Sequence, residues 1–413
     1  MRKQIEGSRA IAEAVARCRP QVVPAYPITP QTHIVEAIGA MAKDGSLPGC
    51  QFITVESEFG AMSAAIGASA AGSRAYTATA SQGLLYMAEA LFNAAGLGLP
   101  VVMTVANRAI GAPINIWNDH SDSMSQRDCG WIQLYAKDNQ AAADLHVIAF
   151  ALAEELSVPV MVCVDGFVLT HAFEPIDLPS PEQVDTFLPP YHPRQFLDPA
   201  DPVSIGAMVG PEAYTEVRYL SNYQLGQAAD VFPTLARRYG AGVGRTVRAV
   251  ESYRTDGAET VIVALGSVSG TAQELVDELA ADVGVLTLTM FRPFPYAEVR
   301  AALAGARRVV VLERSFSPGA GGVVSADVRT ALMGSSAQIS TVIAGLGGRA
   351  VSKASLRQML ADLDAGRLGA MTFLDLRRDA VEREITRLHR SRDTGPHALS
   401  VLRESGVPAS RIG

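Results

Sequence analysis

The chain has 413 residues, of which 48% are hydrophobic and 19% are charged, and its formal net charge is −7. This length allows two or three domains with a sizeable core, and the acidic balance argues against a binding surface for nucleic acids or anionic membranes. No apolar run reaches transmembrane length, and the N-terminus lacks the uninterrupted apolar segment of a signal peptide, so we expect a cytoplasmic protein.

The first part of the chain alternates helix-like and strand-like segments, a pattern typical of a parallel α/β sheet. The predicted strands cover 21–25, 51–55, 75–80, 100–106 and 159–164. The predicted helices between them cover 31–43, 60–72, 84–97 and 139–155. The run 52–55 is interpreted as a buried strand. The helix after it consists almost entirely of Gly, Ala and Ser, which lets another backbone or a flat ligand approach closely.

Polar residues follow the ends of these predicted strands, in the sequences YPITP, ESE, SQG, NRA and DGF. Because the carboxyl ends of the strands form the ligand crevice in doubly wound sheets, we expect one functional edge there. Ordinary turns and helix caps account for Ser81 and Asp165, but not for Glu58 or Arg108. A helix cap also accounts for Glu56, since the helix dipole favours a carboxylate near the N-terminus.

Prolines become frequent between residues 171 and 211, which predicts an extended connection over the surface. Strand-like runs then resume in ETVIVALG, GVLTLTMFRPFP, RRVVVLERS and ISTVIAGLGG, which predicts a second α/β unit. The turn GSVSG lacks the nucleotide-binding patterns, and we interpret it as a packing turn. The predicted boundaries are 1–185 for the first domain, 186–250 for the connection and its helices, 251–352 for the second domain and 353–413 for a helical tail.

The spacing of cysteine and histidine residues predicts no metal site. The four cysteines lie far apart without a CxxC pair, and the seven histidines form no HExxH pattern. This spacing argues against a self-contained iron–sulfur or zinc site. We expect the cysteines to be buried free thiols in a reducing compartment.

Five motifs together identify a family. In chain order they are AYPITPQT at 25–32, VESEFGAMSAAIGASAAG at 55–72, TASQGL at 79–84, NRAIGAPINIWNDHSD at 107–122 and DGFVLTH at 165–171. This set resembles the alpha subunit of the thiamine-diphosphate-dependent 2-oxoacid:ferredoxin oxidoreductases, with the pyruvate enzymes nearest. ALGSVSGT and FRPFP continue the resemblance into the second domain, so that it covers nearly the whole chain.

The resemblance implies a doubly wound parallel sheet of the pyrimidine-binding, thiamine-diphosphate type, followed by a transketolase C-terminal-like α/β domain. In the family a separate beta subunit holds the diphosphate and its Mg²⁺, and this sequence accordingly has no GDG motif followed by a spaced Asn. Gamma and delta ferredoxin-like subunits are expected to carry [4Fe–4S] clusters and to pass electrons to ferredoxin or another acceptor. The implied reaction is the oxidative decarboxylation of a 2-oxoacid, with coenzyme A, to acyl-CoA and CO₂.

The resemblance also assigns roles to individual residues. Glu58, the second acid of ESE, corresponds to the glutamate that hydrogen-bonds the pyrimidine ring and activates the cofactor. Arg108 corresponds to the arginine that holds the substrate carboxylate, for which a guanidinium is well suited. Thr29 corresponds to the hydroxyl that contacts substrate near the reacting carbon. Further cofactor contacts are expected from Ile28, Ser81 and Gln82.

The sequence departs from the pyruvate pattern at Phe59, Ile110 and Gly111, and Phe59 and Gly111 are predicted to reshape the acyl pocket. The intact PITP argues against an oxalate-specific enzyme. Pyruvate is therefore the first expectation, followed by phenylglyoxylate and branched-chain oxoacids, with NAD as an alternative final acceptor. Two rivals stay open: a transketolase-like or dehydrogenase-like thiamine enzyme that uses lipoamide, and a non-catalytic structural paralogue.

Overall fold

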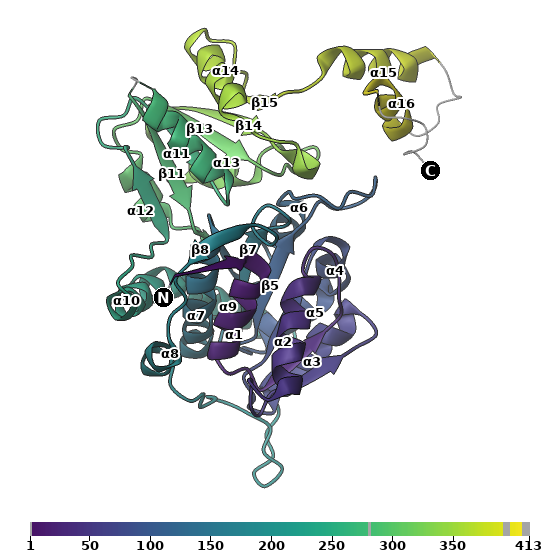
Figure 1. Cartoon of the computed structure of the whole chain (residues 1–413), viewed down its shortest axis with the longest axis vertical. Coiled ribbons are helices and arrows are strands. Elements are labelled where there is room, and N and C mark those ends of the chain that lie inside the picture. The colour runs from purple at the N-terminus through teal and green to yellow at the C-terminus, as the bar shows by residue number, and fades with distance from the viewer. Residues whose placement is uncertain (1, 280–281, 391–396, 407–413) are drawn as a thin grey trace.

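The computed structural model describes residues 2–279, 282–390 and 397–406. Two sheet-based units follow one another along the chain and lie against each other, with the N-terminal unit below the C-terminal unit in Figure 1. The predicted architecture, two α/β units with mostly parallel sheets, is confirmed. Within these ranges no helix combines the length and the apolar character that a membrane crossing requires.

The sheet of the first unit has the strand order β12-β6-β7-β5-β4. Its central strands are buried along their whole length and rich in Val, which is typical of a parallel sheet covered on both faces. A separate parallel pair, β2 and β3, continues this layer through a parallel bridge between Val22 and Ala75. The bounds are β2 Val22–Ala25, β3 Gln51–Thr54, β4 Tyr76–Thr79, β5 Val102–Asn107, β6 Ile132–Tyr135, β7 Val160–Asp165 and β12 Met290–Arg292.

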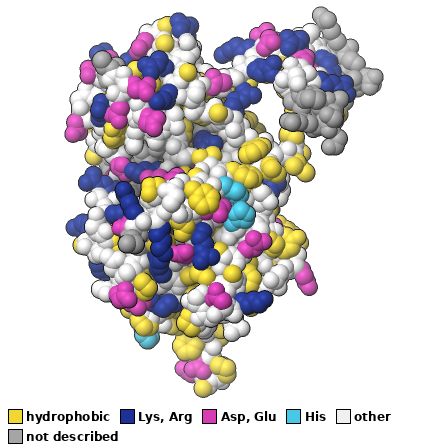
Figure 2. Space-filling model, viewed as in Figure 1, with side chains coloured by type: hydrophobic (Ala, Val, Ile, Leu, Met, Phe, Trp, Pro, Cys, Tyr) yellow, Lys and Arg dark blue, Asp and Glu magenta, His cyan; other side chains and the backbone are white. Residues whose placement is uncertain are grey.

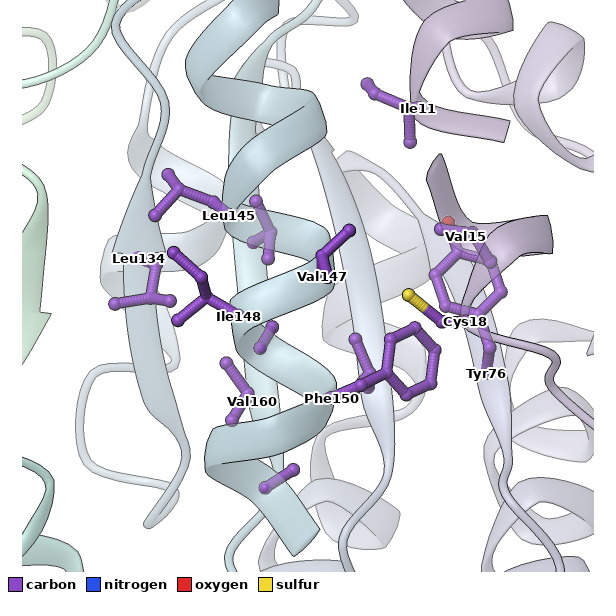
Figure 3. Packing of buried hydrophobic residues seen from close by; sticks show 14 of the residues in the cluster. Ile11, Val15, Cys18, Tyr76, Leu134, Leu145, Val147, Ile148, Phe150 and Val160 are labelled. Atoms are coloured by element: carbon purple, nitrogen blue, oxygen red, sulfur yellow. The ribbon is translucent and has the colours of Figure 1, made fainter. Parts of the chain in front are cut away.

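Helix α7, Asn139–Leu156, forms the centre of the first core. It begins where the Asp138 side chain accepts a hydrogen bond from the Ala141 N–H at 2.6 Å, and almost all of its residues are buried. Leu145, Ile148 and Phe150 project from it among the strand residues in Figure 3. The other helices of this unit are α1 Gly7–Arg17, α2 Thr32–Asp44, α3 Glu58–Ala70, α4 Ser81–Tyr86, α5 Ala88–Gly96 and α6 Ser121–Ser125.

The second unit has the strand order β15-β14-β13-β10-β11-β9, in which only β9 is antiparallel to its neighbour. Its strands are β9 Val250–Tyr253, β10 Thr260–Ala264, β11 Val283–Leu288, β13 Arg308–Glu313, β14 Gln338–Ile343 and β15 Met371–Phe373. Its helical segments are α11 Val268–Glu278, α12 Tyr296–Ala302, α13 Val323–Ala331, η1 Leu346–Gly348 and α14 Lys353–Asp364.

The segment between the units begins with strand β8, Phe173–Ile176, which pairs antiparallel with β1, Lys3–Glu6. Residues 188–213 then contain no helix or strand, as the prolines predict, although β8 and α8 occupy the start of the predicted connection. The helices of this segment are α8 Pro181–Phe187, α9 Tyr214–Gly226 and α10 Ala228–Val243. After the second unit come α15 Arg378–Arg390 and α16 His397–Glu404.

Three expectations about the elements were wrong. The run 52–55 is not buried, because β3 has only β2 as a neighbour and Ile53 is 42% exposed. GVLTLTMFRPFP is not one strand, since β11 belongs to the second sheet whereas β12 pairs antiparallel with β6 of the first. The tail from residue 353 is not only helical, because β15 extends the second sheet beside β14. The domain boundaries stay a prediction.

The four cysteines are buried free thiols, as predicted. Burial raises the pKa of the Cys18 thiol to about 12 and that of the Cys50 thiol to about 11. These groups therefore remain protonated at neutral pH.

Candidate active site

The parallel strands β2 to β5 and β7 end at one edge of the first unit, and the predicted site residues follow these ends. Asn107, the last residue of β5, pairs with Asp165, the last residue of β7. The polar segments that follow the strands are therefore neighbours in space. This edge is where ligands bind in open α/β sheets.

Glu58 is the first residue of α3 and is only 8% exposed. It does not cap its helix, and neither does Glu56, because Ser57 accepts the hydrogen bond from the Gly60 N–H at 3.1 Å. The Glu58 carboxylate lies over Gly83 in α4: a Cβ at Gly83 would lie 2.6 Å from Glu58 Oε1. Glu58 is thus buried for a reason other than capping.

The Glu58 carboxylate and a neighbouring hydroxyl both lack a protein partner. A Cβ at Gly83 would also lie 2.6 Å from Thr79 Oγ1, so the Thr79 hydroxyl adjoins the Glu58 carboxylate. Among the described residues, the buried Thr79 Oγ1 has no hydrogen-bond partner, and no hydrogen bond reaches the Glu58 carboxylate. Burying a hydroxyl without a partner is costly. The Glu58 and Thr79 side chains fill the space over the Gly83 backbone, where a larger residue would displace them.

The two predicted substrate contacts, Arg108 and Thr29, touch each other. Arg108 Nη1 donates to the Thr29 carbonyl oxygen at 3.0 Å, and its Nε donates to the Asn115 carbonyl oxygen at 3.1 Å. Within the described ranges no carboxylate forms an ion pair with this guanidinium, and burial lowers its pKa, with Asp122 opposing the shift. Arg108 is therefore a half-buried, oriented cation with donors left for an anion.

Asp122 organises the site, and its role could not be predicted from the motif that contains it. Its Oδ2 accepts hydrogen bonds from the backbone N–H groups of Ser81 and Arg108, both at 2.9 Å. Its Oδ1 accepts from Asn107 Nδ2 at 2.8 Å and from the Ser123 N–H at 2.7 Å. Burial raises the pKa of Asp122 to about 6, and these donors act in the opposite direction. One carboxylate thus fixes the segments after β4 and β5 together.

The expected cofactor contacts lie around the same place. Ser81 begins α4 with a φ of 49°, and its hydroxyl donates to the Ala109 carbonyl oxygen at 2.6 Å. Gln82 adjoins Gly111, where a Cβ would lie 2.5 Å from Gln82 Nε2. Ile28 is half-buried and packs against the first core. The structure therefore gathers all six predicted residues at one edge.

Two of the departures from the pyruvate pattern lie away from the buried acid. Phe59 is exposed, and its ring faces Tyr86, also exposed, at a centroid distance of 6.3 Å. Gly111 makes room for the Gln82 side chain. The predicted effect of these residues on the acyl pocket stays a prediction.

The second unit holds the Arg108 loop in place. Asn115 Nδ2 donates to the Gly347 carbonyl oxygen at 3.1 Å, and the Gly347 N–H donates to Asp119 Oδ2 at 3.0 Å. Since residues 115–119 belong to the loop that follows β5, the position of Arg108 depends on contacts with the GLGG turn of the other unit.

A buried ion cluster joins the units beside this loop. Asp165 receives hydrogen bonds from Arg314 at 2.9 Å and from the Ser267 N–H at 2.9 Å, and it lies 2.7 Å from His120 Nε2. Burial alone would raise the pKa of Asp165, but Arg314 and His120 outweigh it and hold that pKa well below its usual range. The turn GSVSG is thus a packing turn, as predicted: a Cβ at Gly266 would lie 2.9 Å from Asp165 Oδ1.

Replacing Arg314 with Met is expected to destabilise the chain by about 3–5 kcal/mol at pH 7, because Asp165 is left charged and buried. The matched change Arg357→Met, in an exposed pair with Glu278, should cost about 0–1 kcal/mol. Denaturant unfolding of both variants measures the difference. Folding lowers the pKa of Asp165, so this carboxylate stabilises the fold fully at pH values above its pKa in the unfolded chain. This stabilisation is lost as the pH falls through the lower pKa that Asp165 has in the folded chain. Equal losses in the two variants would contradict this account.

Comparison with known proteins identifies the family. Residues 13–236 match the family model described as "Pyruvate flavodoxin/ferredoxin oxidoreductase, thiamine diP-bdg", and residues 258–356 match "Pyruvate:ferredoxin oxidoreductase core domain II". The chain belongs to the pyruvate:ferredoxin oxidoreductase family. The resemblance in the sequence and the predicted fold class are both confirmed.

Relatives of this family are similar over nearly their whole length. Pyruvate synthase subunit PorA of Methanosarcina barkeri is 43% identical over 388 residues, which are 91% of this chain and 96% of that protein. PorA of Thermotoga maritima is 42% identical, over 91% of this chain and 98% of that protein. Ketoisovalerate oxidoreductase subunit VorA of Pyrococcus abyssi is 40% identical, over 88% of this chain and 93% of that protein.

A solved structure of a family enzyme shares the fold. The 2-oxoglutarate:ferredoxin oxidoreductase of Magnetococcus marinus, with 2-oxoglutarate, coenzyme A and succinyl-CoA bound, aligns with a TM-score of 0.69 at 18% identity. The alignment covers 87% of this chain and 65% of that chain, so this chain spans just under two thirds of the solved one.

Proposed function

We propose that this chain is the alpha subunit of a pyruvate:ferredoxin oxidoreductase, a pyruvate synthase, and that the edge carrying Glu58 and Arg108 is its part of the active site. The observation that carries the proposal is the buried residue Glu58, whose carboxylate has no hydrogen bond from the described residues and lies beside the unpartnered hydroxyl of Thr79. An aminopyrimidine ring is flat and has nitrogen donors and acceptors along its edge. This ring therefore fits the donor set.

Each chain residue has a defined task in this proposal. Bound thiamine diphosphate supplies the nucleophilic carbon and the electron sink for decarboxylation. Glu58 holds a hydrogen bond to a ring nitrogen of the pyrimidine and thereby moves a proton between that nitrogen and its own carboxyl group. The Thr79 hydroxyl would supply a further hydrogen bond to the ring. Arg108 binds the carboxylate of the oxoacid, and its hydrogen bond to the Thr29 carbonyl oxygen keeps Thr29 beside it.

The site is open at the surface, which supports the proposed partners. Exposed hydrophobic side chains gather where the two units meet and along the adjoining edge of the first unit in Figure 2. Large exposed apolar patches mark interaction sites. The hydrophobic residues exposed on the site segments include Tyr26, Ile53, Phe59, Tyr86, Ile114, Ile116, Trp117 and Val168. A beta subunit that brings the diphosphate and Mg²⁺ would cover them, and gamma and delta subunits with [4Fe–4S] clusters would take electrons to ferredoxin.

Pyruvate is the proposed oxoacid, with coenzyme A as acyl acceptor. The relatives named pyruvate synthase are 41–44% identical to this chain. The VorA relative, at 40%, makes a branched-chain oxoacid the second candidate.

A substrate panel tests the proposal. The chain is co-produced with the subunits encoded beside it, and the complex is assayed with a viologen dye and coenzyme A against pyruvate, 2-oxoisovalerate and phenylglyoxylate. We expect the highest kcat/KM with pyruvate, by at least about tenfold. A preference for 2-oxoisovalerate would mean that this oxoacid, and not pyruvate, is the substrate. An assembled complex that oxidises no oxoacid would contradict the proposed function.

Replacing Gly83 with Ala should specifically weaken cofactor binding, because the added methyl group would displace the Glu58 carboxylate and the Thr79 hydroxyl from their positions. We expect the dissociation constant for thiamine diphosphate to rise at least about tenfold, measured on the complex by calorimetry. Gly67→Ala is the matched control, since no atom lies within 4 Å of a Cβ there. An unchanged dissociation constant for thiamine diphosphate in Gly83→Ala would mean that the pyrimidine binds elsewhere.

A further inference from the structure

Glu6, His33 and His171 form a cluster on the first unit that the active-site proposal does not use. Glu6 ends β1, His33 lies in the first turn of α2, and His171 lies in the turn before β8. One candidate ligand atom of each residue lies within 4.8 Å of those of the other two. Figure 2 shows histidine side chains beside an acidic one on the face of this unit.

Backbone pairing, not sequence spacing, assembles this cluster. Glu6 is opposite Phe173 in the antiparallel pair of β1 and β8, which brings the N-terminal strand to the turn that carries His171. His33 Nδ1 lies 2.8 Å from Glu6 Oε1, and the rings of His33 and His171 are 4.9 Å apart. The three residues come from distant segments, so no local motif exists to reveal them.

The imidazole of His171 is held in a fixed orientation. Its Nδ1 lies 2.8 Å from the hydroxyl of Thr170, a fully buried residue. That hydroxyl accepts a hydrogen bond from the Phe167 N–H at 2.8 Å, and the Thr170 carbonyl accepts one from the Ser8 N–H at 2.9 Å. A partner on one ring nitrogen leaves the other, Nε2, as the ligand atom. A hydrogen bond at the ring nitrogen that does not bind the metal is characteristic of metal-binding histidines.

We propose that Glu6, His33 and His171 bind a divalent transition-metal ion, with Zn²⁺ the favoured one. Two imidazole nitrogens and one carboxylate oxygen form a donor set of zinc sites, whereas Mg²⁺ and Ca²⁺ prefer oxygen ligands alone. Ligand atoms around tetrahedral zinc are about 3.3 Å apart, and the more exposed side chains of His33 and Glu6 would move toward the fixed His171 to reach that spacing. The His33 side chain is 49% exposed, which gives the ion access from solvent and leaves a position for water.

The ion would connect the N-terminal strand to the candidate active site. His33 follows the Thr29 loop into α2, and the Phe167 ring lies 4.9 Å from that of His171 and 4.9 Å from that of Trp117. Trp117 belongs to the loop after β5 that carries Arg108. Metal binding at the cluster therefore stabilises both segments that present the proposed substrate contacts.

Metal titration of the untagged full chain tests the proposal. After removal of bound metal with a chelator, we expect one equivalent of Zn²⁺ to bind, and Co²⁺ to give the visible absorption of a site with nitrogen ligands. His33→Ala and Glu6→Gln should each weaken Zn²⁺ binding at least about tenfold. His192→Ala is the matched control, because His192 is exposed and outside the cluster. The cysteines, all buried, do not compete for the ion.

Thermal unfolding separates metal binding from damage to the fold. Zn²⁺ should raise the melting temperature of the unmodified chain and of His192→Ala, but not that of His33→Ala, while the metal-free melting temperatures agree. Absence of stoichiometric binding in the unmodified chain, or binding that His33→Ala and Glu6→Gln leave unchanged, would overturn the proposal.

Discussion

Replacing Glu58 with Gln in the assembled complex is expected to lower kcat by about 10²–10⁴-fold, the usual contribution of a positioned acid–base group. Gln has nearly the same shape and fills the same buried position, but it cannot exchange a proton with the pyrimidine ring. The direct measurement is deuterium exchange at C2 of the thiazolium, which should slow with kcat while thiamine diphosphate remains bound.

Glu56→Gln is the matched control for this prediction. Glu56 lies two residues earlier, carries the same charge and is exposed. We expect its variant to retain normal exchange and turnover. Normal C2 exchange in Glu58→Gln would mean that Glu58 does not have its proposed role.

Replacing Arg108 with Ala is expected to reduce kcat/KM for the oxoacid by about 10–150-fold, mainly through KM. This corresponds to the loss of about 1.5–3 kcal/mol from a hydrogen bond to a charged group. Arg108→Lys keeps the charge but not the planar fork, so it should restore only part of the loss. Steady-state kinetics of the complex gives these values.

Two control measurements distinguish a loss of substrate binding from a general disturbance of the structure. Arg218→Ala removes an exposed arginine on α9 and should leave KM unchanged. Because Arg108 also holds the Thr29 carbonyl, the affinity of Arg108→Ala for thiamine diphosphate is measured alongside, and we expect it to be retained. An unaltered KM in Arg108→Ala would mean that another group holds the carboxylate.

Much of the first sheet could be predicted from the sequence, because its strands are continuous apolar runs between turn signals. The predicted strand 100–106 is observed as Val102–Asn107, and 159–164 as Val160–Asp165. Strand β6 was missed although it has four residues, as do the predicted strands β2 and β4. The place of β12 depends on a contact between distant segments, which no local pattern encodes. The exposure of β3 likewise depends on its position beside a single neighbour.

The proposed site residues are marked by motifs, and the structure brings them to one edge. The residues that surround them carry no such mark. Thr79 is an ordinary strand residue until its buried hydroxyl proves to lack a partner. Gly83 matters because the Glu58 and Thr79 side chains fill the space over its backbone, and Asp122 because of the four donors that surround it. Burial and convergence in space define these roles, and neither is visible in residue spacing.

The central claim is that the edge around Glu58 receives the pyrimidine ring, and a structure of the assembled complex with thiamine diphosphate tests it most directly. We predict a Glu58 carboxylate oxygen about 2.6–3.2 Å from a pyrimidine ring nitrogen. A pyrimidine bound away from Glu58, with the Glu58 and Thr79 oxygens still without partners, would contradict it.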